Sequence, residues 1–281
     1  MCEFCHTHGE GKKWYLQAKN YSEDLLQDVR RRRYIKEFFS DTDTLAKSTQ
    51  RVVGLMRAPR FVRGIVSRLI TRKMKKVHFG QVVPIEEIEQ IFGFVNSIVR
   101  LACRCRHITL GKEKRYCYGI SLAPDGGELA AIFNDIDKTF FDGPDTTGLE
   151  VLTKDQALAD FRRHEQEGLC HTVWTLRTPF IGGICNCDRA DCLAMQFTVT
   201  HAIPIMFRAE YVAQLNSDAC TGCRACMRVC QFGAIAYSAA TKKVVIEPRS
   251  CYGCGICRAM CKQDAIRLED RNKVPAAAHL W

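Results

Sequence analysis

Apolar residues in the first half of the chain recur at three- and four-residue steps, the pattern of amphipathic helices. A first helix is predicted to start at Ser22. A second helical stretch is predicted over residues 51–76, with an interruption at Pro59. The clearest pattern runs over residues 84–102, with a proline at the first helical position. We expect this third helix to deliver Cys103 at its end.

After residue 107 the pattern changes to short strands and turns, with a strand predicted around Cys117. Thr153 and Gln156 have the spacing of a capping box, so a helix should follow them. A further helix is expected after Asp188 or Asp191, either of which could cap it. Four more strands are predicted near the C-terminus, at residues 211–215, 234–237, 243–246 and 265–268. The predicted fold class is therefore α+β.

A length of 281 residues suggests two domains, or one domain with appendages. The composition divides the chain into a basic helical part, a cysteine-rich α+β middle domain, a repeated C-terminal domain and a tail. The predicted boundaries are 1–76, 77–206, 207–272 and 273–281.

Positive charge is concentrated in one segment. Residues 30–76 hold fifteen lysines or arginines against three acidic residues, a net charge of +12 in a chain whose total is +10. Three interpretations remain open: a solvated helical face, a docking surface for an acidic partner or an anionic membrane, and a nucleic-acid surface. The last is the weakest, because few aromatic residues lie among the arginines and no nucleic-acid-binding motif is present.

Eight cysteines near the C-terminus form two copies of the pattern C-x2-C-x2-C-x3-C, and each copy is followed by an Ala-Ile strand start. The cysteines are Cys220, Cys223, Cys226 and Cys230 in the first copy and Cys251, Cys254, Cys257 and Cys261 in the second. Over residues 211–269 this repeat resembles the bacterial dicluster ferredoxins, which carry two [4Fe–4S] clusters.

The resemblance implies which cysteines share a cluster. The first cluster would take Cys220, Cys223, Cys226 and Cys261, and the second would take Cys251, Cys254, Cys257 and Cys230. Gly222 and Gly253 stand where the loop must bring its backbone close to the cluster. Gln231 and Lys262 stand where the family usually has proline, which leaves the ligands untouched and makes the turns less rigid.

Two further cysteine pairs lie in the middle region, Cys103 with Cys105 and Cys185 with Cys187, each expected at a turn beside a helix. Together they could hold zinc or a third iron–sulfur cluster, and free thiols are the alternative. Cys170, His171 and Cys192 are reserve ligands, whereas Cys117 is expected in the core. With the sequence Gly-Leu-Cys-His at 168–171, this arrangement is similar to that of several ferredoxin-type iron–sulfur proteins of anaerobic microbes. That likeness implies an iron–sulfur protein with a redox partner.

Cys2, Cys5 and His6 match a c-type haem attachment motif. That attachment normally occurs outside the cytoplasm, and no apolar secretory segment follows Met1. A zinc or cluster ligand pair and unbonded terminal cysteines are the other interpretations.

These observations predict an electron-transfer protein with two [4Fe–4S] clusters, passing single electrons between a low-potential donor and a partner oxidoreductase. The alternative is an oxidoreductase with its own centre in the middle domain. A structural or membrane-recruiting subunit of a redox complex is the third possibility. Nucleotide-binding, P-loop and radical motifs are absent from the sequence. No stretch is apolar enough to span a membrane. Because cluster ligands must stay reduced, we expect the cytoplasm of an anaerobic or reducing cell.

Overall fold

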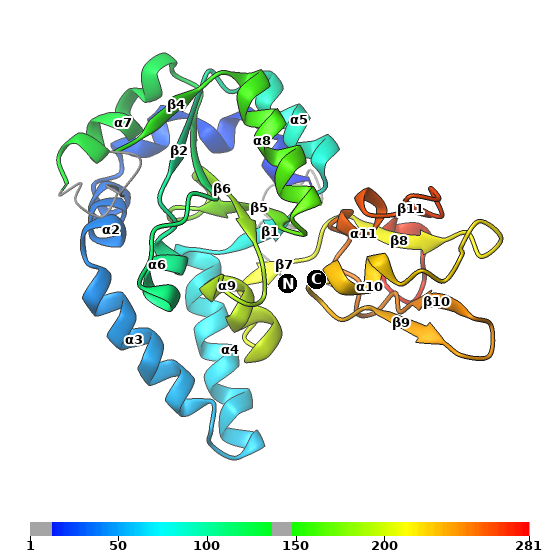
Figure 1. Ribbon diagram of the computed structural model, residues 1–281. Helices are drawn as coiled ribbons and strands as arrows, with labels where there is room; N and C mark the ends of the chain where they lie inside the picture. Colours follow the sequence, from blue (N-terminus) through cyan, green and yellow to red (C-terminus); the bar gives the residue numbers. More distant parts are fainter. Residues whose placement is uncertain (1–12, 137–147, 281) are drawn as a thin grey trace.

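The computed structural model describes residues 13–136 and 148–280. The fold is mixed α+β (Figure 1): a larger body is built on one sheet, and a smaller C-terminal domain lies at its side. A pair of helices extends from the body. In the part of the chain that is described, no helix has the length and apolar character needed to cross a membrane.

The body contains a seven-stranded sheet in the order β4-β2-β3-β6-β5-β1-β7, antiparallel except for the β1–β7 pair. The strands are β1 Gly80–Val82, β2 Ser97–Leu101, β3 Cys117–Ser121, β4 Glu150–Leu152, β5 Cys170–Thr175, β6 Ile181–Cys187 and β7 Met206–Phe207. The predicted strand around Cys117 is confirmed as β3.

One face of this sheet carries the main apolar core. Helices α5 (Ile85–Phe94) and α8 (Lys154–Gln166) pack there, and Phe161 of α8 lies against Val173 and Ile184 of the sheet. The predicted capping box at Thr153 is confirmed at the start of α8. Trp14 and Tyr15 from the N-terminal segment complete this core, although the sequence suggested a separate N-terminal part.

The N-terminal part is helical. It begins with 3-10 turns at Trp14–Leu16, Ala18–Tyr21 and Glu23–Gln27, and continues with α2 Val29–Ser40, α3 Thr42–Leu55 and α4 Arg60–Val77. The helix predicted from Ser22 starts as a 3-10 turn, and Asp28 caps α2 by accepting from the amides of Arg30 and Arg31. The predicted interruption at Pro59 is confirmed, because it separates α3 from α4. These two helices form the extended pair of Figure 1.

The opposite face of the sheet carries cysteines. It is covered by α6 (Arg104–Leu110) and α9 (Leu193–Met195), which continues as a π turn, Gln196–Thr200. Helix α7 (Gly127–Asn134) packs beside α2 at the other end of the sheet.

The helix predicted over residues 84–102 is wrong in its second half. It ends at Phe94, Val95 adopts an extended backbone, and Ser97–Leu101 is strand β2. Ile98 and Val99 are β-branched and find partners on both sides, in β3 and β4, which favours the strand. Cys103 therefore follows a strand and stands at the N-cap of α6. The capping prediction for Asp188 or Asp191 is also wrong, since Cys192 is the N-cap residue of α9.

The C-terminal domain has two related halves. Its elements are β8 Tyr211–Leu215, α10 Ala225–Val229, β9 Ile235–Ser238, β10 Lys243–Ile246, α11 Ile256–Ala259 and β11 Ile266–Asp270, followed by a 3-10 turn at Arg271–Lys273. Strands β9 and β10 form the predicted hairpin, and β8 pairs with β11. Each half places one short helix after its cysteine loop, so the repeat of the sequence is also a repeat of the structure.

Candidate metal centres

Two cavities in the C-terminal domain are each lined by four of the predicted cysteine ligands. The first has an empty volume of about 320 Å³ and is lined by Cys220, Cys223, Cys226 and Cys261. The second has an empty volume of about 350 Å³ and is lined by Cys230, Cys251, Cys254 and Cys257. Each cavity thus takes three cysteines from one run and the fourth from the other, which fits the crossed pattern of two [4Fe–4S] clusters.

The loops that carry these cysteines depend on glycine at two equivalent positions. Gly222 and Gly253 have φ angles of +70° and +69°. A Cβ atom at Gly222 would stand 2.1 Å from the carbonyl oxygen of Lys242, and one at Gly253 would stand 2.1 Å from that of Tyr211. Only glycine fits both the backbone conformation and the close approach. The predicted role of these two residues is therefore supported by their geometry.

Backbone amides point at the cysteine sulfurs in both halves. The amide of Gly222 lies 3.4 Å from Cys220 Sγ, and that of Gly253 lies 3.4 Å from Cys251 Sγ. Ala234 donates in the same way to Cys230 at 3.3 Å. Such N–H···S bonds stabilise negatively charged sulfur, so the loops are suited to thiolates that bind a cluster.

The two cavities differ in their surroundings. In the first, Cys226 is buried but Cys223 is exposed, and it is followed by the exposed cations Arg224 and, on α10, Arg228. In the second, Cys251 and Cys257 are buried. The first cavity therefore lies nearer the solvent, whereas the second lies toward the body of the protein.

Gln231, which replaces the usual proline, connects the second cavity to the body. Its side-chain nitrogen donates to the carbonyl oxygen of Gly168 at 2.8 Å, and its side-chain oxygen accepts from the amide of Arg189 at 2.9 Å. Lys262, the equivalent residue in the other half, is exposed. The two departures from the family pattern thus have different surroundings.

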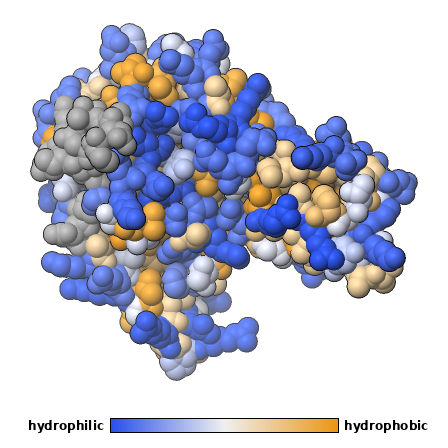
Figure 2. Space-filling model, viewed as in Figure 1, coloured by the Kyte–Doolittle hydropathy of each residue, from blue (hydrophilic) through white to orange (hydrophobic). Residues whose placement is uncertain are grey.

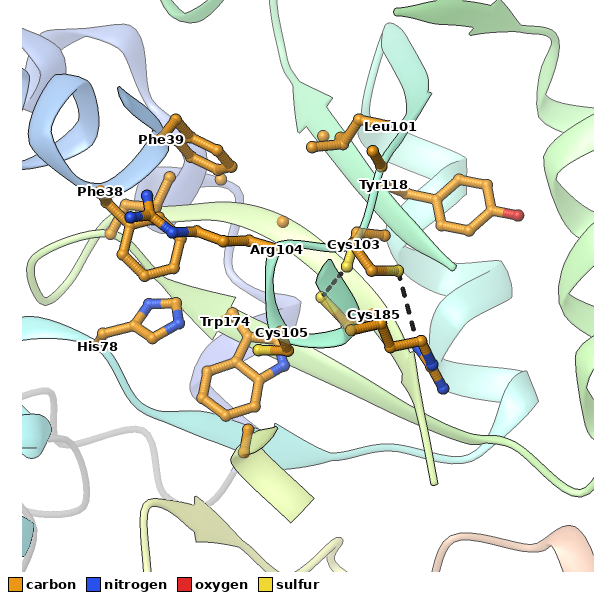
Figure 3. Close-up of a pocket in the computed structure, with 18 of the residues that line it drawn as sticks. Phe38, Phe39, His78, Leu101, Cys103, Arg104, Cys105, Tyr118, Trp174 and Cys185 are labelled. Carbon is orange, nitrogen blue, oxygen red and sulfur yellow. Dashed lines mark hydrogen bonds between the residues drawn. The ribbon is translucent and has the colours of Figure 1, made fainter. Parts of the chain in front are cut away.

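A third and larger cavity lies in the middle domain, between the sheet and α6, with an empty volume of about 740 Å³ (Figure 3). Six cysteines line it: Cys103, Cys105, Cys117, Cys185, Cys187 and Cys192. The four cysteines predicted as ligands are all among them. Phe38, His78 and Trp174 also line this cavity.

The six sulfurs make a nearly continuous set of contacts. The Sγ atoms of Cys117 and Cys185 are 3.2 Å apart, and those of Cys187 and Cys192 are 3.3 Å apart. Cys105 is hydrogen-bonded to Cys192, and Cys103 to Cys117.

Strand geometry explains why Cys185 and Cys187 face the same cavity. They lie on β6, not at the predicted turn, and residues two apart on a strand point to the same side. The register pairs Cys185 with Cys117 of β3, which places Cys117 at the cavity instead of in the expected core. Cys192 arrives from the N-cap of α9.

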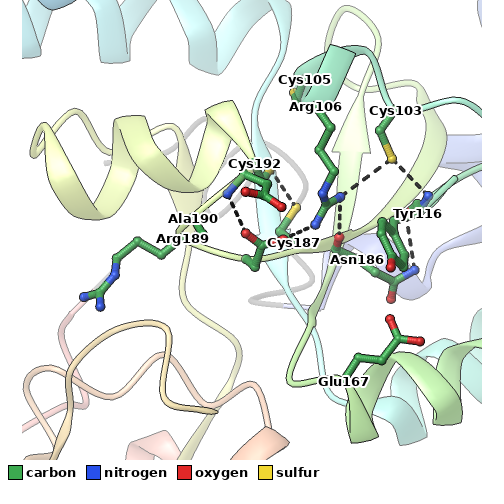
Figure 4. Close-up of polar contacts among 12 residues, drawn as sticks. Cys103, Cys105, Arg106, Tyr116, Glu167, Asn186, Cys187, Arg189, Ala190 and Cys192 are labelled. Carbon is green, nitrogen blue, oxygen red and sulfur yellow. Dashed lines mark hydrogen bonds and ion pairs between the residues drawn. The ribbon is translucent and has the colours of Figure 1, made fainter. Parts of the chain in front are cut away.

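Arg106 is buried beside these sulfurs (Figure 4). It donates to Cys103 Sγ at 3.7 Å and to the carbonyl oxygen of Asn186 at 3.0 Å, and it pairs with the carboxylate of Asp188. Its guanidinium also stacks on the ring of Tyr116, 4.5 Å from the centroid. Burial by itself lowers its pKa, but the electrostatic interaction with Cys103, Cys192, Cys187 and Asp188 raises the pKa of Arg106 well above its usual value.

The reserve ligands His171 and Cys170 lie on opposite faces of the sheet. His171 projects to the other face of the sheet, where its Nδ1 lies 2.6 Å from the side-chain oxygen of Asn186, and it does not line the cavity. Cys170 is fully buried on the cysteine face and hydrogen-bonds to Cys254 of the second C-terminal cavity. This contact lowers the pKa of Cys254.

Within residues 13–136 and 148–280, no three histidine, cysteine, aspartate or glutamate side chains are arranged to hold a single metal ion. This is also true of the two cysteine cavities of the C-terminal domain. Cys2, Cys5 and His6 lie outside the described residues.

Comparison with known proteins identifies the C-terminal domain. A search of curated proteins gives no match to the chain. Residues 208–271, however, match the family of 4Fe-4S dicluster domains, and this range contains all eight cysteines of the two cavities. The C-terminal part of the chain is therefore a dicluster ferredoxin domain, and the protein is an iron–sulfur protein of the electron-transfer type.

Proposed function

We propose that the protein binds two [4Fe–4S] clusters and passes single electrons between a low-potential donor and a partner oxidoreductase. The observation that carries this proposal is the pair of cavities, each with four cysteines drawn from both runs. The clusters, when bound, supply the one-electron chemistry. The chain contributes the thiolates, the amides that donate to them, and the glycine loops that bring the backbone close.

The different surroundings of the cavities suggest a direction for the electrons. Cys223 is exposed and lies beside Arg224 and Arg228, so an acidic redox partner would approach the first cluster. The second cluster would then relay electrons toward the body of the protein.

Metal analysis of anaerobically purified protein tests the two clusters. The C-terminal domain should contribute about eight irons and eight sulfides, and the reduced protein should show the EPR spectrum of two coupled cubes. Replacing Cys226 by serine should remove the first cluster and the coupling, and Cys257→Ser should remove the second. If both variants keep the iron content and spectrum of the wild type, the assignment of these ligands is wrong.

The basic helices suggest a second contact with a partner. Arg60, Arg63, Arg68 and Arg72 are exposed on α4, together with the apolar Phe61, which is 75% exposed. Figure 2 shows polar residues around a band of apolar ones over this helix pair. We infer docking of an acidic protein here, and an anionic membrane surface is the alternative.

The salt dependence of partner binding distinguishes a docking surface from a solvated helical face. Binding should weaken steeply with salt, because charges are screened over about 8 Å at physiological ionic strength. Reversing the charge of Arg63, Arg68 and Arg72 should abolish binding of the partner. Arg31 is unsuitable for this test, since it is buried and donates to the carbonyl oxygen of Arg177. If the triple variant binds both the partner protein and anionic vesicles as the wild type does, the segment is only a solvated helical face.

The second candidate function is an oxidoreductase with its own redox centre in the middle domain. The cavity lined by six cysteines favours it. The predicted ligands are Cys103, Cys105, Cys185 and Cys187, and either zinc or iron–sulfur would satisfy four thiolates. Changing Cys103 and Cys187 to serine distinguishes loss of zinc, loss of about four irons and no change in metal. The last outcome would leave ordinary thiols.

A further inference from the structure

We propose that the middle-domain cavity holds a third iron–sulfur cluster, which exchanges single electrons with the second cube past Cys170. The inference extends the proposed two-cluster function, and it rests on that function only for the source of the electrons. Four lines of argument lead to it: the donors, the space, the charge and the contact between the domains.

The potential metal ligands that line the cavity are the sulfur atoms of cysteines. Six thiols, more than one metal centre needs, select thiophilic centres such as zinc and iron–sulfur clusters. A structural zinc needs four ligands that converge on one point at about 2.3 Å. In the described parts of the chain no three ligands converge in this way. The two cysteine cavities of the dicluster domain are likewise without such a triad, so the middle cavity resembles them in this respect.

The cavity also has the space for a cluster. Its empty volume of about 740 Å³ is roughly twice that of either cysteine cavity in the dicluster domain, 320 and 350 Å³. Part of this space exists because Gly119 and Gly183, which pair across β3 and β6, present no side chain beside Cys117 and Cys185. By the same measure, this cavity is therefore larger than either of the two that are proposed to hold a cube.

Buried positive charge surrounds the sulfurs. Arg104 and Arg106 flank Cys105 and are only 4% and 2% exposed. Among the described residues, the Nε atoms of both arginines and Nη1 of Arg104 have no hydrogen-bond partner. Unpaired buried guanidinium nitrogens are costly. The guanidinium of Arg104 lies over the ring of Phe38, 4.9 Å from its centroid, whereas Arg106 donates to Cys103 Sγ. A cluster bound by four thiolates is an anion with sulfide acceptors, and it would supply the missing partner of Arg106 Nε.

The cavity is in contact with the second cube through one residue. Cys170 pairs with Cys187 across β5 and β6, so both side chains lie on the same face of the sheet. The Cys170 thiol in turn hydrogen-bonds to Cys254, a predicted ligand of the second cube. Gln231, beside the ligand Cys230, fixes the same interface. Cys170 thus lies between a cysteine of the middle cavity and a predicted ligand of the second cube.

The transfer step is a simple exchange. The reduced second cube loses one electron and returns to its oxidised state, and the third cluster gains that electron. No bond to the protein forms or breaks, and no further reactant is needed.

Iron analysis of the full-length protein is the first test. With three cubes, anaerobic protein should contain about twelve irons per chain. Cys105→Ser with Cys187→Ser should lower the iron content to about eight, and the spectrum of the two coupled cubes should remain. Wild-type protein with about eight irons and one zinc, or with eight irons and no other metal, overturns the proposal. If wild-type protein lacks the two C-terminal cubes, the proposed function is refuted instead, so the two failures are distinguishable.

EPR tests the contact between the centres without relying on the folding of the cysteine variants of the cavity. In reduced wild-type protein, the signal of the third cluster should be broadened by the second cube. Cys257→Ser, which lacks the second cube, should narrow that signal, whereas Cys226→Ser, which lacks the more distant first cube, should change it less. Cys170→Ser should keep about twelve irons but slow the intramolecular transfer after pulsed reduction. A third signal that is equally narrow in all these proteins, or an unchanged transfer rate in Cys170→Ser, refutes the proposed route.

Discussion

Replacing Gly222 by alanine should remove the first cluster and leave the second. A Cβ atom at this position would stand 2.1 Å from the carbonyl oxygen of Lys242, where ordinary van der Waals contact begins at 3.4 Å. The carbonyl group would have to move by about 1.3 Å, and it belongs to the tight turn between β9 and β10. The positive φ angle adds about 1–2 kcal/mol for any residue with a side chain.

Gly233→Ala is the matched control. Gly233 has a φ angle of +67°, close to the +70° of Gly222, but a Cβ atom there would meet nothing within 4 Å. Both variants therefore carry the same backbone strain, and only Gly222→Ala carries the steric conflict. The control should be destabilised by about 1–2 kcal/mol and keep both cubes.

Iron content and EPR measured on the two variants in parallel form the assay. Gly222→Ala should lose about four irons and the coupling between the cubes, and Gly233→Ala should lose neither. Equal iron content and equal thermal stability in both variants would show that the close approach to Lys242 does not govern cluster binding, and the reasoning would fail.

Three further predictions concern the body and its contact with the dicluster domain. Burial raises the pKa of Glu165 to about 7. The stability that the protonated carboxyl group contributes is therefore lost as pH rises from about 4.5 through 7. Glu165→Gln should remove this loss, and identical pH profiles of thermal unfolding in the variant and the wild type would contradict the prediction. Gln231→Ala removes two hydrogen bonds, worth about 1 kcal/mol each, and should speed proteolysis between the domains, whereas Lys262→Ala, at the equivalent exposed position, should not. Arg106→Gln leaves Asp188 without its ion-pair partner and should lower the free energy of unfolding by about 3–5 kcal/mol in denaturant titrations; a change below 1 kcal/mol would contradict this.

The sequence predicted the presence and the strands of the dicluster domain, because its signals are local. The spacing of each cysteine run fixes a single loop and a short helix, and the positions of Gly222 and Gly253 follow from that loop. The hairpin of β9 and β10 was also predicted, since apolar runs flank a short polar turn.

The middle domain was less predictable, because its geometry depends on contacts between distant segments. The apolar spacing over residues 84–102 suits a helix, and only the pairing of β2 with β3 and β4 shows that its second half is a strand. Cys117 joins the cavity through the register of β3 with β6, which no local pattern specifies. Cys185 and Cys187 were expected at a turn, although their two-residue spacing also places them on one face of a strand.

The two halves of the dicluster domain are alike in their loops but not in their contacts, and this difference agrees with the proposed electron path. In one half, Gln231 replaces the usual proline and binds Gly168 and Arg189, which holds the second cavity against the body. In the other half, Lys262 is exposed and the first cavity stays near solvent. Under the proposed path, electrons would enter at the first cavity, which is near solvent, and the contacts of Gln231 would hold the second cavity against the body that receives them.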